Sequence, residues 1–250
     1  MKSLKIALIG YGRMGRMVEQ VALRRGHEVV LRVDQLSADL AKELRASGAE
    51  VAIEFTVPAS AYANCRVCLD EGIPVVSGTT AWPEGVEELR CLVRQEGGKT
   101  FLWSSNYSIG VNLFFEINRR VARLMQHAPA YQLALEEMHH QHKLDAPSGT
   151  AITLAEEIVS CRTDLDSWVL VEEAQEIKTG MLPISSVREG EVPGIHTVTY
   201  RSEEDELRLT HEAFGREGFA LGAVVAAEYA SCHMGDLRMS DVLNEMISLL

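Results

Sequence analysis

The sequence predicts an α/β protein in which a Rossmann-like, doubly wound parallel sheet is joined to a smaller α+β domain with an open mixed sheet. Three observations lead to this prediction. Short apolar runs alternate with longer amphipathic stretches in the first part of the chain, as in βαβ units. A glycine-rich turn follows the first apolar run. Later segments alternate apolar with polar side chains, as half-buried strands do.

The first part of the chain predicts strands and helices in strict alternation. Each expected strand is a short apolar run, and each expected helix is a longer stretch with an apolar side. Strands are expected at residues 5–9, 29–33, 51–55, 74–77 and 100–103. Helices are expected at residues 14–25, 36–47, 59–71 and 83–95. The break at Val57 and Pro58 separates the third strand from the helix that follows it.

The pattern changes after Asn106. A long helix at residues 111–127 precedes a strand at 131–138 and a helix at 150–160. The period-two segments that follow predict antiparallel strands at residues 168–174, 185–188, 196–201 and 206–211. The chain returns to helix at residues 219–233 and 240–249.

The overall charge restricts the partners of this chain. Its 250 residues contain 24 Lys and Arg against 36 Asp and Glu, a net charge of -12 that opposes binding to nucleic acid. No stretch reaches the roughly 18 apolar residues that a membrane span needs, so no membrane partner is expected. Five cysteines without a secretory signal indicate a reducing cytoplasm. Cys65 and Cys68 lie in a helical pattern without a second pair, which favours buried thiols over half a metal or redox motif.

A glycine motif stands where the first predicted strand meets the first predicted helix. Gly10 permits a tight turn, Gly12 lets a pyrophosphate approach the backbone, and Gly15 lets the helix pack closely on its strand. The helix N-terminus directs N–H groups and partial positive charge at the phosphates. We therefore expect a dinucleotide site formed by Gly10, Tyr11, Gly12, Arg13, Met14 and Gly15.

Asp34 ends the second predicted strand, at the distance from the glycines where an acidic residue reaches the adenosine ribose hydroxyls. Its charge would repel a ribose 2′-phosphate, and Gln35 beside it adds no positive charge, so the sequence favours NADH. Arg13 and Arg16 leave NADPH open. A second glycine-hydroxyl turn, Gly78-Thr79-Thr80, follows a strand end of the kind that faces the ligand crevice, although such a turn is weak support on its own.

Residues 137–150 hold the basic cluster that an anionic ligand would need in so acidic a chain. His139, His140, His142 and Lys143 lie just before the start of a predicted helix. Ser148, Gly149 and Thr150 offer hydroxyls and backbone N–H groups at that helix N-terminus, which is an anion-binding arrangement. Histidine is the side chain most readily poised as an acid near neutral pH. The cluster therefore predicts a site for a small carboxylate.

Other interpretations of this cluster remain open. Three close histidines could bind a metal, but no acidic or cysteine ligand is obviously spaced to complete the site, and no metal is expected. Residues 148–150 could form an N-cap and nothing more. Ser148 with a histidine could indicate a hydrolase, although the G-x-S-x-G turn is absent and the glycine motif would have no role.

At this point the sequence resembles the 4-hydroxy-tetrahydrodipicolinate reductases, also called dihydrodipicolinate reductases, over nearly its whole length. The most specific match is Glu137-Met-His-His-Gln-His-Lys-Leu-Asp-Ala-Pro-Ser-Gly-Thr-Ala151. Supporting matches are residues 10–16, Phe55-Thr56, Gly78-Thr-Thr80, residues 105–112, Val187-Arg-Glu-Gly190 with His196, Leu209-Thr-His211 and residues 239–243.

The resemblance implies hydride transfer from NADH or NADPH to a small dicarboxylate imine in lysine biosynthesis. It implies that His139 is the general acid that protonates C3 of the ring and that Lys143 orients or polarises the substrate. The residues expected to hold the two carboxylates are His140, Ser148, Gly149 and Thr150. The cofactor site is expected to extend to Phe55, Thr56, Gly78, Thr79, Thr80, Ser104, Ser105, Asn106 and Tyr107, with Gly78, Thr80, Ser105 and Tyr107 near the nicotinamide.

The resemblance also implies a domain plan and a homotetramer. Residues 1–106 and 214–250 are expected to form the dinucleotide-binding domain, and residues 107–213 the substrate-binding and oligomerisation domain. The chain departs from the family pattern at Val57, where many members carry arginine, and at Ala81, where glycine is usual. The missing arginine again favours NADH. Two rivals stay open: another Rossmann dehydrogenase of an amino or imino acid, and a nucleotide sensor without catalysis.

Overall fold

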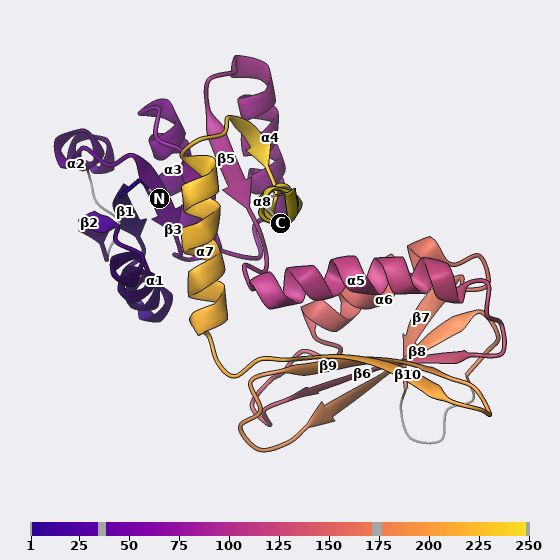
Figure 1. Ribbon diagram of the computed structural model, residues 1–250. Coiled ribbons are helices and arrows are strands. Elements are labelled where there is room, and N and C mark those ends of the chain that lie inside the picture. The colour runs from indigo at the N-terminus through magenta and orange to yellow at the C-terminus, as the bar shows by residue number, and fades with distance from the viewer. Residues whose placement is uncertain (1, 35–38, 172–176, 249–250) are drawn as a thin grey trace. The chain divides into compact units, whose positions relative to one another are not determined.

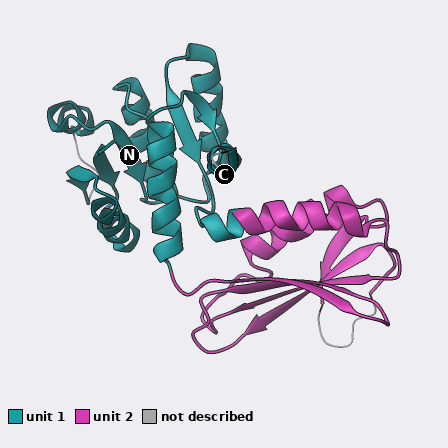
Figure 2. Cartoon of the chain, in the orientation of Figure 1, with its two compact units in different colours: residues 1–112, 216–250 teal, residues 113–215 magenta. Residues whose placement is uncertain are grey.

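The computed structural model describes residues 2–34, 39–171 and 177–248 and divides the chain into two compact units (Figures 1 and 2). Unit 1 comprises residues 1–112 and 216–250, and unit 2 comprises residues 113–215. The first boundary between them falls inside helix α5 (Ile109–Met125).

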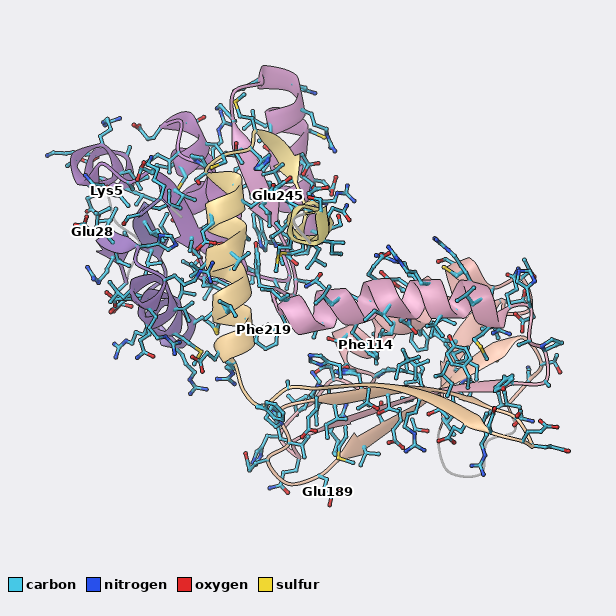
Figure 3. The ribbon with its side chains drawn as sticks, viewed as in Figure 1. Lys5, Glu28, Phe114, Glu189, Phe219 and Glu245 are labelled. Atoms are coloured by element: carbon cyan, nitrogen blue, oxygen red, sulfur yellow. The ribbon has the colours of Figure 1, made fainter. Side chains whose placement is uncertain are left out.

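Unit 1 contains a six-stranded parallel sheet. Its strands follow the order β11-β5-β4-β3-β1-β2, with β1 (Lys5–Ile9), β2 (Glu28–Val33), β3 (Val51–Glu54), β4 (Val75–Ser77), β5 (Thr100–Trp103) and β11 (Gly235–Leu237). Lys5 and Glu28 pair where β1 and β2 begin (Figure 3). The residues of β3 and β4 are all buried, because helices cover both faces of a parallel sheet.

Two helical layers sandwich this sheet. Helices α1 (Arg13–Arg24), α7 (Glu217–Ala230) and α8 (Met239–Ser248) form one core with it, and α2 (Leu40–Ser47), α3 (Pro58–Asp70) and α4 (Pro83–Glu96) form the other. Alanine and glycine in α7 allow close packing, since a Cβ atom at Gly222 would lie 1.6 Å from the carbonyl oxygen of Tyr107. Cys65 and Cys68 are free and fully buried in the second core, as expected.

Unit 2 places two helices on one face of a five-stranded mixed sheet (Figure 1). The strand order is β10-β9-β6-β8-β7, with β6 (Gln132–His139), β7 (Ser167–Leu170), β8 (Met181–Arg188), β9 (Ile195–Arg201) and β10 (Glu206–Glu212). Helix α5 and helix α6 (Gly149–Cys161) pack their apolar sides on the sheet. Phe114 of α5, labelled in Figure 3, is buried there. Its ring stacks on that of His211 of β10.

The expected α/β class with an open mixed second sheet is confirmed, with two differences in detail. The antiparallel expectation is wrong for β7 and β8, which run parallel to each other, while β8 also runs parallel to β6. A period of two tells which face a side chain takes and not which way the partner strand runs. Strand β11 was not expected, because three residues carry no readable period. Gln35 and the expected structure at residues 36–38, 172–174 and 249 lie outside the described residues.

None of the helices among the described residues is long and apolar enough to cross a bilayer.

Candidate active site

The glycine motif of unit 1 opens onto a cleft of about 410 Å³ at the carboxyl ends of β1 and β3. These two strands are neighbours, and the chain order of the sheet reverses there, which is where ligands bind in doubly wound sheets. The cleft is lined by Ile9, Gly10, Tyr11, Gly12, Val33, Asp34, Phe55, Thr56, Val57, Ser60 and Asn64. The acidic residue and the glycines expected to act together therefore share one cleft.

The three glycines meet three different steric demands. Gly10 has a φ of 94°, and a Cβ atom there would lie 2.0 Å from the carbonyl oxygen of Phe55. A Cβ atom at Gly15 would lie 2.1 Å from the carbonyl oxygen of Gly10, so the helix can approach its strand only without a side chain. Gly12 has nothing within 4 Å of its Cβ position and leaves space beside the start of α1. This cradle fits a dinucleotide pyrophosphate.

A second cleft of about 400 Å³ adjoins the first and brings the remaining turns together. It is lined by Gly12, Arg13, Met14, Phe55, Thr56, Pro58, Gly78, Thr79, Thr80 and Ala81. The phenyl ring of Phe55 occupies the space that a side chain at Gly78 would need, since a Cβ atom there would lie 2.1 Å from Phe55 Cε1. Ala81 has a φ of 63°, the left-handed conformation that explains why glycine is usual at this position.

A buried carboxylate, Glu54, joins the two turns that line the second cleft. It has no exposed surface and ends β3. Its Oε1 atom accepts hydrogen bonds from the backbone N–H of Thr56 at 2.9 Å and from the hydroxyl of Thr79 at 2.8 Å. Ser77 and the hydroxyl of Thr56 donate to it as well. Glu54 thus sets the spacing of the turns after β3 and β4, a role that the sequence analysis did not identify.

The turn at residues 104–107 follows β5. Its polar groups bind one another, with Ser104 Oγ donating to the carbonyl of Asn106 at 2.8 Å, and Ser105 is exposed. Tyr107 is 2% exposed, and its hydroxyl donates to the carbonyl of Ser77 at 2.7 Å. The Tyr107 side chain therefore supports the turn after β4 from inside the core. A contact of Tyr107 with a nicotinamide would therefore have to come from its main chain.

In unit 2, the end of strand β6 directs an acid and a histidine to the same face of the sheet. Leu135, Glu137 and His139 are buried at alternate positions, because side chains two residues apart in a strand share a face. The same face of β9 carries His196, which lies opposite Glu137 in the antiparallel pairing. Three buried polar side chains thus meet at the edge of an otherwise apolar core.

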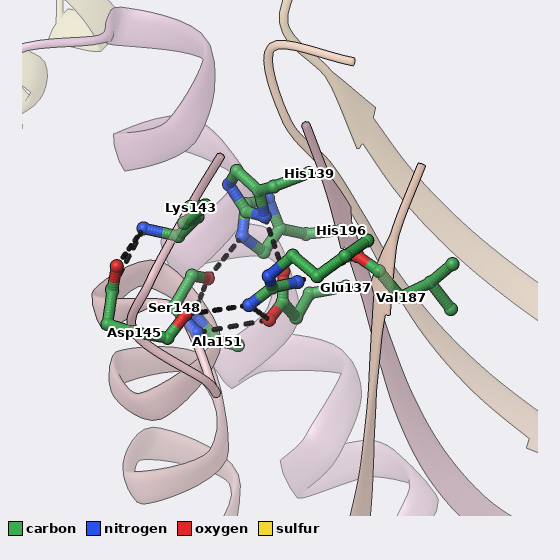
Figure 4. A network of polar contacts seen from close by, with 9 residues as sticks. Glu137, His139, Lys143, Asp145, Ser148, Ala151, Val187 and His196 are labelled. Atoms are coloured by element: carbon green, nitrogen blue, oxygen red, sulfur yellow. Dashed lines mark hydrogen bonds and ion pairs between the residues drawn. The ribbon is translucent and has the colours of Figure 1, made fainter. Parts of the chain in front are cut away.

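Glu137 is the centre of the resulting network (Figure 4). His139 Nδ1 donates to its Oε2 atom, while Arg188 Nη2 at 2.7 Å and the backbone N–H of Ser148 at 3.2 Å donate to its Oε1 atom. Burial alone would raise the pKa of Glu137, but hydrogen bonds from His139 and Arg188 outweigh it and lower the pKa to about 2. The carboxyl group is therefore ionised at neutral pH.

His196 is held neutral beside this carboxylate. Burial is the main cause that lowers its pKa to about 3, the positive charge of a protonated His139 adds to the effect, and the Glu137 carboxylate opposes it. Its ring lies edge-on to that of His139, with 5.1 Å between ring centroids. Its Nε2 atom lies 2.9 Å from the hydroxyl of Ser148 (Figure 4).

Ser148 serves the architecture of the site. It is 2% exposed, and its hydroxyl caps α6 by accepting a hydrogen bond from the backbone N–H of Ala151 at 3.2 Å. A serine nucleophile needs an accessible hydroxyl, so this geometry gives no support to a hydrolase. Gly149 and Thr150 form the first turn of α6, where the positive end of the helix dipole attracts anions.

The remaining basic residues of the cluster, His140, His142 and Lys143, lie in the loop between β6 and α6. Lys143 Nζ binds both carboxylate oxygens of Asp145 at 2.8 Å. His140 donates its backbone N–H to the carbonyl of Val192, and its buried Nδ1 atom has no partner among the described residues. An incoming carboxylate would therefore compete with Asp145 for Lys143.

Glu137, His139 and His196 also offer ligand atoms within 4.8 Å of one another, a set that suits zinc. Glu137 is the acidic ligand that the sequence analysis did not recognise. The guanidinium of Arg188 already occupies its Oε1 atom, and a positive charge so close disfavours a second cation.

Glu137, Arg188 and His196 received no role from the sequence analysis, although all three stand in matched motifs. One signal was available for Glu137. An acidic residue two positions before His139 occupies an inward position of an alternating strand, and a buried carboxylate requires partners. The contribution of Arg188 and His196 depends on the pairing of β6 with β8 and β9, which no local pattern reveals.

Comparison with family models places both halves of the chain in one family. A model of the dihydrodipicolinate reductase N-terminus matches residues 4–107, and a model of the dihydrodipicolinate reductase C-terminus matches residues 110–243. The chain belongs to the dihydrodipicolinate reductase family.

Curated relatives agree with this family assignment. A 4-hydroxy-tetrahydrodipicolinate reductase from Christiangramia forsetii is 45% identical over 97% of this chain and 99% of that protein. A protein of the same name from Archaeoglobus fulgidus is 31% identical over 90% of this chain and 93% of that protein. Both relatives match this chain along nearly their whole length.

Solved structures share the fold at lower identity. A dipicolinate-bound dihydrodipicolinate reductase from Paenisporosarcina sp. TG-14 superposes with a TM-score of 0.75 at 21% identity, covering 95% of this chain and 98% of that chain. An amine dehydrogenase from Mycobacterium smegmatis gives a TM-score of 0.58 at 14% identity, covering 94% and 95%. The fold is therefore shared between the dihydrodipicolinate reductase family and other dehydrogenases.

The depressed pKa of His196 predicts how stability responds to acid. Folded His196 stays neutral down to about pH 3, whereas the unfolded chain takes up this proton near pH 6.5, so stability falls as the pH drops below 6.5. The unfolding free energy of the wild type should therefore fall with decreasing pH, and we expect His196→Gln to reduce this slope by up to about 1.4 kcal/mol per pH unit. Urea unfolding at pH 6.5, 5.5 and 4.5 measures it.

The exposed His127 gives a control for this measurement. His127→Gln should leave the pH dependence of the unfolding free energy as in the wild type. Glu137, whose pKa is also depressed, loses its own contribution only as the pH falls below about 4.5, which keeps the two windows apart. An unchanged slope in His196→Gln above pH 4.5 would contradict a neutral buried His196.

Proposed function

We propose that this chain reduces dihydrodipicolinate (4-hydroxy-tetrahydrodipicolinate) to tetrahydrodipicolinate with NADH or NADPH, a step of lysine and diaminopimelate biosynthesis. The observation that carries the proposal is the buried pair of His139 and Glu137 next to the N-terminus of α6. An acid fixed beside an anion-binding helix start is what the reduction of an anionic imine needs. Membership of the dihydrodipicolinate reductase family supports the same substrate.

In this proposal the clefts of unit 1 hold the nucleotide. Gly12 and the first N–H groups of α1 bind the pyrophosphate, Asp34 binds the adenosine ribose, and Gly78, Thr79 and Thr80 hold the nicotinamide end. The turn at Ser104, Ser105 and Asn106 with the main chain of Tyr107 completes that end. The bound nucleotide supplies the hydride.

The residues of unit 2 bind the substrate and supply a proton. The start of α6 at Gly149 and Thr150, together with the ring of His140, holds the carboxylates, and the Ser148 hydroxyl caps this helix start. Lys143 leaves its ion pair with Asp145, binds the substrate and polarises the substrate. His139 then protonates the ring carbon next to the site of reduction.

We also propose that the protein acts in the cytoplasm. All five cysteines are free thiols, and thiols persist in reducing compartments.

A direct assay tests the function. Purified protein should oxidise NADH in the presence of freshly prepared dihydrodipicolinate, and dipicolinate should inhibit competitively with that substrate. Oxidation of free amino acids by NAD⁺ with no dihydrodipicolinate reduction would identify another amino-acid dehydrogenase. NADH binding without any turnover would identify a sensor.

Two variants test the roles of the basic residues. We expect His139→Gln to lower kcat by about 10²- to 10⁴-fold with little change in NADH affinity, because one positioned acid contributes that much. Lys143→Ala should lower kcat and raise substrate KM, because it removes both a binding contact and polarisation. Steady-state kinetics and NADH titration measure these effects.

His142 provides the control, since its side chain is 67% exposed and lies 3.4 Å from Glu191. His142→Gln should keep the kcat of the wild type. Wild-type turnover by His139→Gln would remove this residue from the mechanism.

The lining of the first cleft supports a preference for NADH. Asp34 and Val57 share this cleft, so a 2′-phosphate would meet a negative charge and no arginine at position 57. We expect kcat/KM for NADH to be at least that for NADPH. Val57→Arg should raise kcat/KM for NADPH by roughly tenfold, because a charge-assisted hydrogen bond to phosphate becomes available.

Leu23→Arg adds the same charge at an exposed position of α1 and should leave the NADH to NADPH ratio unchanged. A clear NADPH preference in the unmodified protein would contradict the proposed role of Asp34.

The uncovered face of the sheet in unit 2 supports assembly into a homotetramer. Both helices of the unit lie on the opposite face (Figure 1). The outward positions carry many apolar or uncharged side chains, which suits burial between copies: Ala134, Met138, Met181, Pro183, Ser185, Val187, Ile195, Thr197 and Thr199. We therefore propose this face as the interface between subunits.

A charge at the centre of that face should disrupt assembly. We expect the wild type to sediment as a tetramer and Ala134→Arg, on the central strand β6, to shift it toward smaller species, because unpaired buried charges are costly. Leu124→Arg, at a position of α5 that is 71% exposed, should stay tetrameric. Sedimentation velocity measures the size, and a monomeric wild type would contradict the proposal.

A further inference from the structure

Glu137 is a carboxylate with no exposed surface, so it cannot touch a substrate itself. All its described partners belong to the site. It lies opposite His196 of β9 and Ser186 of β8, accepts from Arg188 at the end of β8, and accepts from Ser148 at the start of α6. One carboxylate therefore connects three strands and the helix start that is proposed to hold the substrate carboxylates.

The contact with His139 determines which ring nitrogen is available for chemistry. Nδ1 donates to Glu137, which leaves Nε2 as the atom that can exchange a proton with a ligand. Nε2 faces Gly194, where a Cβ atom would lie only 2.9 Å away. The absence of a side chain at Gly194 keeps this edge of the ring clear. The His139 side chain is 11% exposed, so only a small part of the ring is open.

We propose that Glu137 is the positioning residue of the reduction and acts through His139, by fixing Nδ1–H so that Nε2–H points at the substrate carbon. This inference rests on the proposed function. In the step, the Nε2–H bond breaks and its electron pair stays on the nitrogen. A C–H bond forms with the electron pair that hydride addition has placed on the ring carbon. Nδ1 keeps its proton throughout, and the neutral imidazole is reprotonated from water after product release.

Arg188 and Ser148 make Glu137 rigid enough for this role. They bind Oε1, which leaves Oε2 for His139, so the carboxylate cannot rotate away from the ring without losing two hydrogen bonds. Arg188 also donates to the carbonyl of Asp145, in the loop that carries Lys143. The position of His139 is thereby fixed relative to the start of α6 and to the loop that carries Lys143, both of which are proposed to bind the substrate.

The chain contains a matched control for a buried His–Glu–Arg group. In unit 1, Glu228 accepts from His27 at 2.7 Å and from Arg25 at 2.7 and 2.8 Å, far from any proposed chemistry. Glu137→Gln and Glu228→Gln each remove one negative charge from beside a histidine and an arginine. A purely structural effect should be similar in both variants, whereas a positioning effect should appear only in Glu137→Gln.

The test combines kinetics with spectroscopy. We expect Glu137→Gln to lower kcat by about 10- to 1000-fold, with unchanged NADH affinity and substrate KM within about threefold of the wild type. The solvent deuterium isotope effect on kcat should rise, because proton transfer becomes limiting. Glu137→Asp, which keeps the charge one methylene shorter, should recover part of kcat. Glu228→Gln should keep the kcat and the isotope effect of the wild type.

Nitrogen-15 NMR of histidine-labelled protein gives a readout that needs no substrate. The His139 signal, assigned by its loss in His139→Gln, should report Nδ1–H in the wild type and in Glu228→Gln. In Glu137→Gln it should report a mixture of tautomers.

Each other outcome overturns the inference. Wild-type kcat in Glu137→Gln does so, as does a kcat loss equal to that of Glu228→Gln or a His139 signal unchanged by the substitution. If Glu137→Gln does not fold, two other results overturn the inference. One is an Nε2–H tautomer of His139 in the wild type, and the other is full kcat in Glu137→Asp. Absence of dihydrodipicolinate reduction by the wild type would instead refute the proposed function, while the NMR result would still decide the role of Glu137.

Discussion

The organisation of both candidate sites depends on the requirement that a buried carboxylate be fully hydrogen-bonded. An ionised carboxyl group without partners costs several kcal/mol in a protein interior, so the chain must bring donors to it. Glu54 gathers donors from the turns after β3 and β4, and Glu137 gathers them from β6, β8 and α6. Each carboxylate thereby fixes loops whose own sequences would leave them free to move. Glu54 and Glu137 thus position the residues that are proposed to contact ligands, without contacting a ligand themselves.

This division explains what could be predicted from the sequence. The dinucleotide turns were predictable because their requirements are local: a positive φ at Gly10 and open space at Gly12 can be inferred from the residue type. The basic cluster was predictable because its members are neighbours in the chain. Glu54 and Glu137 were not assigned a role, because their donors lie up to 51 residues away and meet them only through the register of the sheets.

Strand direction marks the same limit within the fold. The alternating pattern of β8 correctly predicts a strand with one buried face. The antiparallel pairing predicted from the same pattern is wrong, because β8 runs parallel to β6. Direction depends on how the chain returns to the sheet after α6, a property of connections rather than of side chains. The consequence reaches the site, because parallel pairing of β8 with β6 puts Arg188 beside His139 in the register and brings its guanidinium to Glu137.

The pairing of permanent charges around the site determines what can attract a dicarboxylate. Arg188 is matched by Glu137 and Lys143 by Asp145, so these four charges nearly cancel at short range. The attraction that remains comes from the N-terminal dipole of α6 and from imidazole protons, both of which act over a few ångströms. In a chain with a net charge of -12, such a cluster does not collect anions from a distance. Under the proposed function it favours a ligand that reaches the helix start and also displaces Asp145 from Lys143, and a ring with two carboxylates can do both at once.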